Sequence, residues 1–129
     1  MKGQRLFVRA IEETDREAVQ SFLESEGRAG DLPACGLLGK LVGDLVAVLE
    51  MRITADSVEV HEIVVARDLR RKRIGRVMLA ELEQIARKIE RQRLVVPETQ
   101  RGTQDGAAEF LRRVGFEREG SRWIREVRK

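Results

Sequence analysis

The amino-acid sequence predicts an α/β protein with a central mixed β-sheet of about six or seven strands and helices on both faces. The order of apolar patterns along the chain is β-α-β-β-β-α-β-α-β-β. Consecutive strands favour antiparallel pairing, whereas strand–helix–strand units favour parallel crossovers. Charged residues make up 36% of the chain and aliphatic residues dominate its apolar set, which favours a folded, highly soluble protein over a disordered one. The 129 residues are predicted to form one domain over residues 1–129.

Four apolar segments in the first half of the chain are predicted to be strands, because turn-forming residues bound them; they cover residues 6–11, 35–42, 45–53 and 60–65. Thr14-Asp15-Arg16-Glu17 has the pattern of a capping box and predicts a helix that ends at Gly27. Gly43-Asp44 separates the second and third segments and predicts a hairpin turn.

The most regular helical pattern follows the fourth strand. Apolar residues recur three or four positions apart, as on one face of an amphipathic helix; they are Ile74, Met78, Leu82, Ile85 and Ile89. The remaining segments are predicted to be a buried strand, a polar loop, a helix and a closing hairpin, over residues 93–97, 98–106, 107–114 and 116–127. Gly115 is placed just past the end of that helix, and Trp123 is the apolar anchor of the hairpin.

A basic turn leads into the long helix, with five cations among seven residues: Arg70, Arg71, Lys72, Arg73, Ile74, Gly75 and Arg76. A helix N-terminus already carries about half a positive charge, so cations are unfavourable there unless an anion binds. Backbone N–H groups and arginines would then point at the same phosphates. We interpret the turn as a candidate phosphate site; a solvated basic surface is the alternative.

At this turn the sequence resembles the signature of the GNAT family of N-acetyltransferases, Gln/Arg-x-x-Gly-x-Gly/Ala, which follows the family's fourth strand. Arg70 and Gly75 fit that pattern, whereas Arg73 stands where the first glycine is usual. The segment Phe110-Leu111-Arg112-Arg113-Val114-Gly115-Phe116 is similar to the family's Phe-Tyr-x-x-x-Gly-Phe. Together with the order of the elements, the resemblance covers nearly the whole chain.

The resemblance implies that acetyl-CoA is the cofactor and that its pyrophosphate lies on the basic turn. In the family the fourth strand parts from the fifth, so backbone groups are left to hold the pantetheine arm and the thioester oxygen; here they belong to Ile63, Val64 and Val65. Gln104 stands where an asparagine often binds the cofactor. The family commonly has two helices between its first two strands, and residues 24–35 leave room for little more than a turn. The acceptor side is therefore predicted to be open.

Glu62 is the first candidate for the base that deprotonates the amine, and His61 is the second. Adjacent strand residues are predicted to face opposite sides of the sheet, with Glu62 on the face of Val60 and Val64. A carboxylate among apolar neighbours near a cleft suits proton abstraction. In the alternative interpretation Glu62 only contacts solvent or Arg67, and His61 is a packing residue.

The family's usual proton donor to the departing thiolate is a tyrosine at the position of Leu111, and this chain contains no tyrosine. A thiol pKa of about 8.5 permits the thiolate to leave without an acid. The resemblance thus implies an N-acetyltransferase that acts by direct attack of a small-molecule or peptide amine in a ternary complex. A regulatory module of the same fold, which binds acetyl-CoA without transfer and acts on a protein partner, is the alternative.

Composition argues against several other classes of protein. The net charge of +3 is small for a nucleic-acid binder, and no aromatic platform accompanies the basic turn. One cysteine excludes an intramolecular disulfide, and one histidine argues against a His/Cys metal site. No apolar run approaches the roughly 20 residues of a membrane span. A cytoplasmic location fits best; the acceptor and the oligomeric state are left open.

Overall fold

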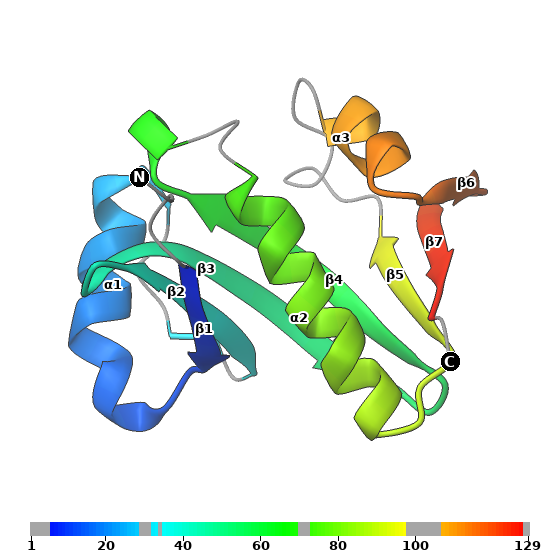
Figure 1. Cartoon of the computed structure of the whole chain (residues 1–129), viewed down its shortest axis with the longest axis horizontal. Coiled ribbons are helices and arrows are strands. Elements are labelled where there is room, and N and C mark those ends of the chain that lie inside the picture. Colours follow the sequence, from blue (N-terminus) through cyan, green and yellow to red (C-terminus); the bar gives the residue numbers. More distant parts are fainter. Residues whose placement is uncertain (1–5, 29–31, 34, 70–72, 98–106, 128–129) are drawn as a thin grey trace.

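The computed structural model describes residues 6–28, 32–33, 35–69, 73–97 and 107–127. These residues form one seven-stranded sheet with three α-helices, α1 (Arg16–Ser25), α2 (Ile74–Lys88) and α3 (Ala107–Arg113) (Figure 1). The strands are β1 (Leu6–Ala10), β2 (Gly36–Leu41), β3 (Asp44–Ile53), β4 (Ser57–Val65), β5 (Arg93–Pro97), β6 (Glu117–Glu119) and β7 (Arg122–Glu126). The predicted order of elements and the predicted mixed sheet are confirmed.

The sheet has the strand order β1-β2-β3-β4-β5-β7-β6. The first four strands form an antiparallel meander, β4 and β5 are parallel, and β5, β7 and β6 are again antiparallel. Helix α2 is the crossover between the two parallel strands, as parallel pairing requires. Gly43, at φ 84°, lies in the turn of the predicted hairpin between β2 and β3.

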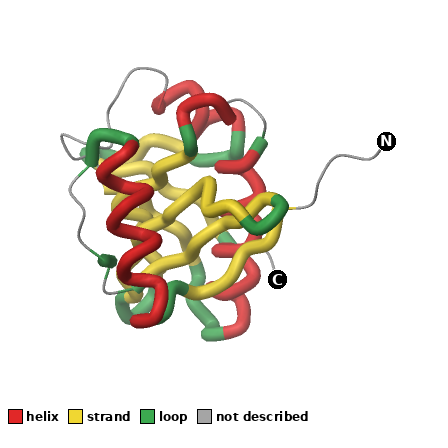
Figure 2. Tube along the Cα trace, turned by 90° about the vertical axis from the view of Figure 1, so that its left-hand side faces the viewer, coloured by secondary structure: helices red, strands yellow, loops and turns green. Residues whose placement is uncertain are grey.

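Helices cover both faces of the sheet (Figure 2). On one face α1 buries Val19 and Leu23 against Leu38 of β2, Val48 of β3 and Val64 of β4. On the other face the apolar stripe of α2 packs into a larger core that includes Leu111 of α3 and Trp123 of β7; its α2 members are Ile74, Met78, Leu79, Leu82 and Ala86. The helical periodicity in the sequence therefore predicted most of this face, because Ile74, Met78 and Leu82 are buried whereas Ile85 and Ile89 are only partly buried.

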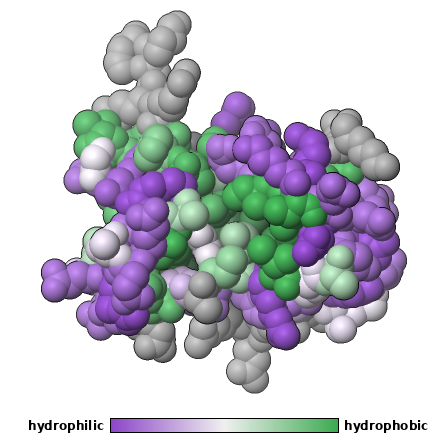
Figure 3. Space-filling model, turned by 90° about the horizontal axis from the view of Figure 1, so that it is seen from below, coloured by the Kyte–Doolittle hydropathy of each residue, from purple (hydrophilic) through white to green (hydrophobic). Residues whose placement is uncertain are grey.

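Few large apolar side chains reach the surface. Those exposed among the described residues are Phe7, Val42, Ile53 and Val77. Seen from below, apolar side chains gather in groups between hydrophilic ones (Figure 3). A surface of this kind follows from a chain in which 36% of the residues are charged.

The parallel pairing of β4 and β5 is short. Only Ser57–Glu59 pairs with Arg93–Val95, and beyond Glu59 the two strands diverge (Figure 1). Strand β4 continues along its other edge, where it pairs with β3 as far as Val65. The separation of β4 from β5 that the family resemblance implied is thus present in the structure.

The N-terminus of the first helix differs from the predicted capping box. A 3₁₀ turn, Glu13–Asp15, precedes α1, and the Asp15 carboxylate accepts a hydrogen bond from the backbone N–H of Glu12 at 2.7 Å. Capping therefore begins two residues before Thr14. The physical reason is Arg9 of β1, which holds Asp15 by two hydrogen bonds of 2.8 Å and so fixes where the helix starts. Gly27, at φ 78°, follows the end of the helix as predicted.

Candidate active site

A β-bulge in β4 determines where the two candidate bases point. Glu50 of β3 pairs with Glu62 and the next residue, Met51, pairs with Val60, so His61 is an extra residue without a strand partner. An extra residue reverses the alternation of side chains across that point. Val60 consequently belongs to the core under α2, whereas Val64 belongs to the core under α1.

The predicted faces of these residues were therefore partly wrong. Glu62 lies on the α1 face with Val64, as predicted, but Val60 lies on the opposite face. His61 also lies on the α1 face, because its Nε2 is 3.0 Å from a carboxylate oxygen of Glu59, which alternates with Val60. The bulge thus places both candidate bases on one face, where simple strand alternation predicted two.

Glu62 is largely buried and has a charged neighbour. Its side chain is 14% exposed, and one carboxylate oxygen lies 3.4 Å from a terminal guanidinium nitrogen of Arg28. Arg28 follows α1 in the chain, so the end of that helix brings a cation to the bulge. Arg67, which the sequence suggested as a possible partner of Glu62, follows the end of β4 and is exposed. The arrangement holds a carboxylate in a fixed place at the point where β4 leaves β5.

Three residues of β4 follow the bulge at the diverging edge. Ile63, Val64 and Val65 pair with Leu49, Val48 and Ala47 of β3, and the ladder with β5 has already ended. Val64 is buried under α1, while Ile63 and Val65 pack against the core on the α2 face. Their side chains therefore serve packing, and only their backbone groups are candidates for binding. That role for the backbone stays a prediction.

The described part of the basic turn begins at Arg73. This residue precedes α2 with a left-handed backbone, φ 67°, and its side chain is exposed. A left-handed conformation favours glycine, which explains why the family signature has glycine at this position. No acid lies in the first turn of α2, whose 15 residues give it a full dipole. Arg70, Arg71, Lys72 and Gln104 lie outside the described residues.

The first turn of α2 also contacts α3. A Cβ atom added to Gly75 would lie 3.3 Å from Cζ of Phe110, so α3 lies close against this turn. Ile74 is buried in the core, whereas the side chain of Arg76 is exposed. Leu111, which stands at the position of the family's tyrosine, is 6% exposed within the same core.

The described residues contain no group of three or more potential metal-ligating side chains. Within the same part of the chain, no helix is both long enough and apolar enough to pass through a membrane. Of the residues around the bulge, sequence reasoning missed Arg28 and Glu59. Alternation along β4 could have paired Glu59 with His61. Nothing local connects Arg28 with Glu62, because their contact depends on the packing of α1.

Solved structures that share this arrangement of elements include N-acetyltransferases. One is the ribosomal-protein-S18-alanine N-acetyltransferase of Escherichia coli. Its sequence is 16% identical to this one, and the two structures match with a TM-score of 0.76 over 97% of this chain and 96% of that one. The PaiA N-acetyltransferase of Thermoplasma acidophilum, crystallised with coenzyme A, is 17% identical, with a TM-score of 0.74 over 97% and 99%. The fold is therefore that of the N-acetyltransferases.

A third structure, Neisseria gonorrhoeae N-acetylglutamate synthase with coenzyme A and N-acetyl-glutamate, is 17% identical, with a TM-score of 0.72 over 99% of this chain and 36% of that one. No curated protein matches the sequence. The model of the Acetyltransferase (GNAT) family, however, matches residues 5–116. This protein belongs to the GNAT acetyltransferase family, as the resemblance in its sequence implied.

Proposed function

We propose that this protein transfers the acetyl group of acetyl-CoA to a primary amine by direct attack in a ternary complex. The observation that carries the proposal is the divergence of β4 from β5 beside a partly buried carboxylate, Glu62. Membership of the GNAT family supports the choice of reaction. Small molecules and peptides both offer suitable amines.

Binding of acetyl-CoA is supported by the basic turn and the start of α2. Cations and free backbone N–H groups at a helix N-terminus suit a pyrophosphate, and the first turn of α2 contains no acid to oppose it. The diverging edge of β4 offers backbone partners for an extended pantetheine chain. Two of the structural neighbours were crystallised with coenzyme A, which is consistent with this assignment. When bound, the cofactor supplies an activated acetyl thioester.

Glu62 is proposed to accept the proton that the amine must lose before it can attack. The Arg28 guanidinium, 3.4 Å away, holds the carboxylate in place. His61 is the second candidate, and its contact with Glu59 leaves the other ring nitrogen to act. Both side chains lie on the α1 face. An amine entering from that face would meet them before it met the core.

The departing thiolate has no acid at the position of Leu111, whose side chain cannot donate a proton. Coenzyme A can leave as a thiolate when the ordinary thiol pKa, about 8.5, lies close to the working pH. The same substitution favours the second candidate function, a module that binds acetyl-CoA without transferring it. In the described residues between α1 and β2, no second helix walls the acceptor side, which also favours that candidate.

A thermal-unfolding comparison tests the binding step with acetyl-CoA, coenzyme A and duplex DNA as separate ligands. A ligand at one hundred times its dissociation constant stabilises a protein by about 2.7 kcal/mol. We expect both coenzyme forms to raise the unfolding temperature and DNA to leave it unchanged. The double substitution Arg71→Glu/Arg73→Glu should abolish the shift. Lys88→Glu/Arg122→Glu, which changes the net charge equally away from the turn, should preserve it.

Transfer is then tested by following coenzyme A release with a panel of small amines and peptides. Release that depends on an amine, together with an acetylated product, is the expected result. Binding without any acetylated product across the panel would contradict transfer and favour the regulatory module. An unchanged affinity in a folded Arg71→Glu/Arg73→Glu protein would remove the phosphate site from the basic turn.

A further inference from the structure

A partly buried ion pair joins α2 to the C-terminal hairpin, and the proposed reaction does not use it. Glu83, in the middle of α2, is 6% exposed. One terminal nitrogen of Arg125, on β7, donates to its carboxylate. The other terminal nitrogen of Arg125 donates to the carbonyl oxygen of Val114, just past the end of α3, at 3.0 Å. One guanidinium therefore links α2, β7 and the end of α3.

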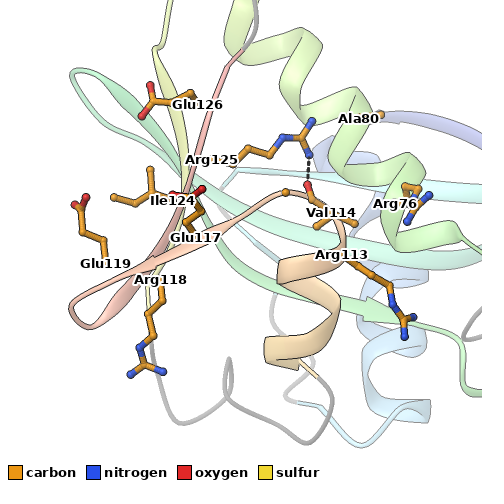
Figure 4. Close-up of a pocket in the computed structure, with 11 residues that line it drawn as sticks. Arg76, Ala80, Arg113, Val114, Glu117, Arg118, Glu119, Ile124, Arg125 and Glu126 are labelled. Carbon is orange, nitrogen blue, oxygen red and sulfur yellow. Dashed lines mark hydrogen bonds between the residues drawn. The ribbon is translucent and has the colours of Figure 1, made fainter.

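The link crosses a hollow in the surface. A cavity of about 670 Å³ lies between α2, the end of α3 and the hairpin of β6 and β7, and Arg125 is among its lining residues. In Figure 4 the side chain of Arg125 extends from β7 toward Val114. Its stem passes Gly115, where an added Cβ atom would lie 3.7 Å from Cδ of Arg125. In this hollow, then, α2 and the hairpin are bridged by a polar side chain.

Stability alone does not account for such a bridge. A buried ion pair is on average no more stabilising than well-packed apolar residues of similar volume. What the planar guanidinium provides is geometry, because its two terminal nitrogens bind two partners at a fixed distance and angle. Arg87 lies 3.5 Å from the other carboxylate oxygen of Glu83, so both oxygens of the acid are held by cations.

The position of the bridge relates it to the opening between β4 and β5. One wall of the opening is β4 and the other is β5 with its partner β7, while α2 packs against both β4 and β5. The two walls are joined at one end by the three-residue ladder between β4 and β5. Arg125 pairs with Leu94, the middle residue of that ladder on β5, and from there its side chain reaches α2 and the end of α3. Farther along α3, Phe110 lies close to Gly75 at the start of α2.

We propose that Arg125 is a positioning residue which, through Glu83 and the Val114 carbonyl, fixes the end of α3 against α2. It thereby places α3 beside the first turn of α2 and sets the affinity for acetyl-CoA. The inference rests on the proposed function, since it assumes that acetyl-CoA occupies the opening. Arg125 itself lies outside the reacting groups and acts only through the elements it joins.

Calorimetric titration with acetyl-CoA tests this role in three variants. Arg125→Lys keeps the charge but cannot bind both partners as a planar fork. Glu83→Gln keeps the shape and loses the charge. We expect each variant to raise the dissociation constant about tenfold. The double variant should bind no more weakly than either single one, because both changes break the same link. Faster amide hydrogen exchange in residues 107–113, without global unfolding, should accompany the loss.

Arg91→Lys is the matched control. Arg91 also bridges two partners, the carbonyl oxygens of Thr54 at 2.7 Å and Ile89 at 2.6 Å, but it does so at the far end of α2. The Arg91→Lys variant should lower the unfolding temperature as much as Arg125→Lys does, and it should leave the affinity for acetyl-CoA unchanged. Equal weakening by both arginine variants would overturn the proposal, because it would indicate a general loss of structure.

The two proposals fail in different ways. If the wild type binds acetyl-CoA and both Arg125→Lys and Glu83→Gln bind it equally well, the positioning role is wrong and the proposed function stands. If the wild type itself binds no acetyl-CoA, the proposed function is wrong and the role of Arg125 falls with it. Should Arg125→Lys fail to fold, Glu83→Gln, which is nearly isosteric, decides the question.

Discussion

Asp15 shows at the scale of single residues how one side chain links three parts of the chain. Hydrogen bonds from Arg9 of β1, and next the hydrogen bond from the backbone of Glu12, lower the pKa of Asp15 from 3.8 to about 2. The carboxylate is buried, whereas the side chain of Arg9 is 33% exposed, so solvent screens part of the interaction. The pair fixes the start of α1 relative to the edge of the sheet.

The folded-state pKa of Asp15 lies below that of the unfolded chain, so its ionised form stabilises the fold above about pH 4. That contribution disappears as the pH falls from about 4 through 2. Asp15→Asn should lower the free energy of unfolding at pH 7 by about 1–2 kcal/mol. It should also reduce the loss of stability on acidification. Urea unfolding between pH 7 and 2 measures both effects.

The control for this change is Glu13→Gln, since Glu13 and Arg16 form an exposed pair at 2.6 Å. Exposed pairs contribute little, so this variant should keep the stability of the wild type. Equal pH dependence in the wild type and Asp15→Asn would show that Asp15 does not carry the acid sensitivity.

Glu62 is the residue on which the proposed proton transfer depends. Glu62→Gln keeps a hydrogen-bonding group beside Arg28 but removes the base, so we expect kcat to fall about 10²-fold or more. Glu50→Gln is the matched control, because Glu50 is the strand partner of Glu62 on β3. It should retain the wild-type rate. Steady-state kinetics with the best amine of the panel measure the difference, and an unchanged rate in Glu62→Gln would assign the base to His61 or to water.

At the scale of elements, the start of α2 combines two unfavourable features. Arg73 has a left-handed backbone, and it adds a cation to the positive end of the helix dipole. Arg73→Gly should remove both, whereas Arg73→Ala should remove only the charge. The glycine variant should therefore be more stable than the alanine variant by about 1 kcal/mol, as chemical denaturation would show. Equal stability of the two would mean that the strain at residue 73 is relieved in solution.

A substitution in α3 distinguishes a transferase from a regulatory module that only binds acetyl-CoA. Leu111→Tyr places a hydroxyl where the family resemblance implies a proton donor. If the thiolate otherwise leaves unaided, the rate should rise by at most ~10²-fold. Leu111 is buried, so the larger ring should cost about 1–3 kcal/mol of stability. Product formation and acetyl-CoA affinity are measured together in both proteins. Tight binding with no product from either would contradict the transferase.

At the scale of the whole molecule, the opening depends on two halves of a sheet that are held apart and aligned. The meander of β1 to β4 forms one half, and β5, β7 and β6 form the other. Strands β3 and β4 pair through seven residue pairs and β5 and β7 through five, while only three residues of β4 pair with β5. The Trp123 indole lies 5.3 Å from the guanidinium of Arg112 on α3 and 5.9 Å from that of Arg118 on β6, which binds α3 to the second half.

The sequence by itself determined the elements of this protein and their order. Period-2 and period-3.6 patterns reflect which side chains must leave water, and that requirement is local to each strand or helix. Gly43 and Gly115 marked turns because glycine, without a Cβ atom, adopts the positive φ angles of these positions at little cost. The basic turn and the segment that ends at Gly115-Phe116 were sufficient to identify the family, and the match of the family model over residues 5–116 confirms it.

Only the tertiary structure decided where the candidate side chains point and what they contact. The bulge at His61 depends on the register between β3 and β4, so alternation within β4 alone placed Val60 and His61 wrongly. The contacts between Arg28 and Glu62 and between Arg125 and Glu83 join residues 34 and 42 positions apart. No local pattern encodes such pairs, because they exist only after packing against the sheet brings distant elements together.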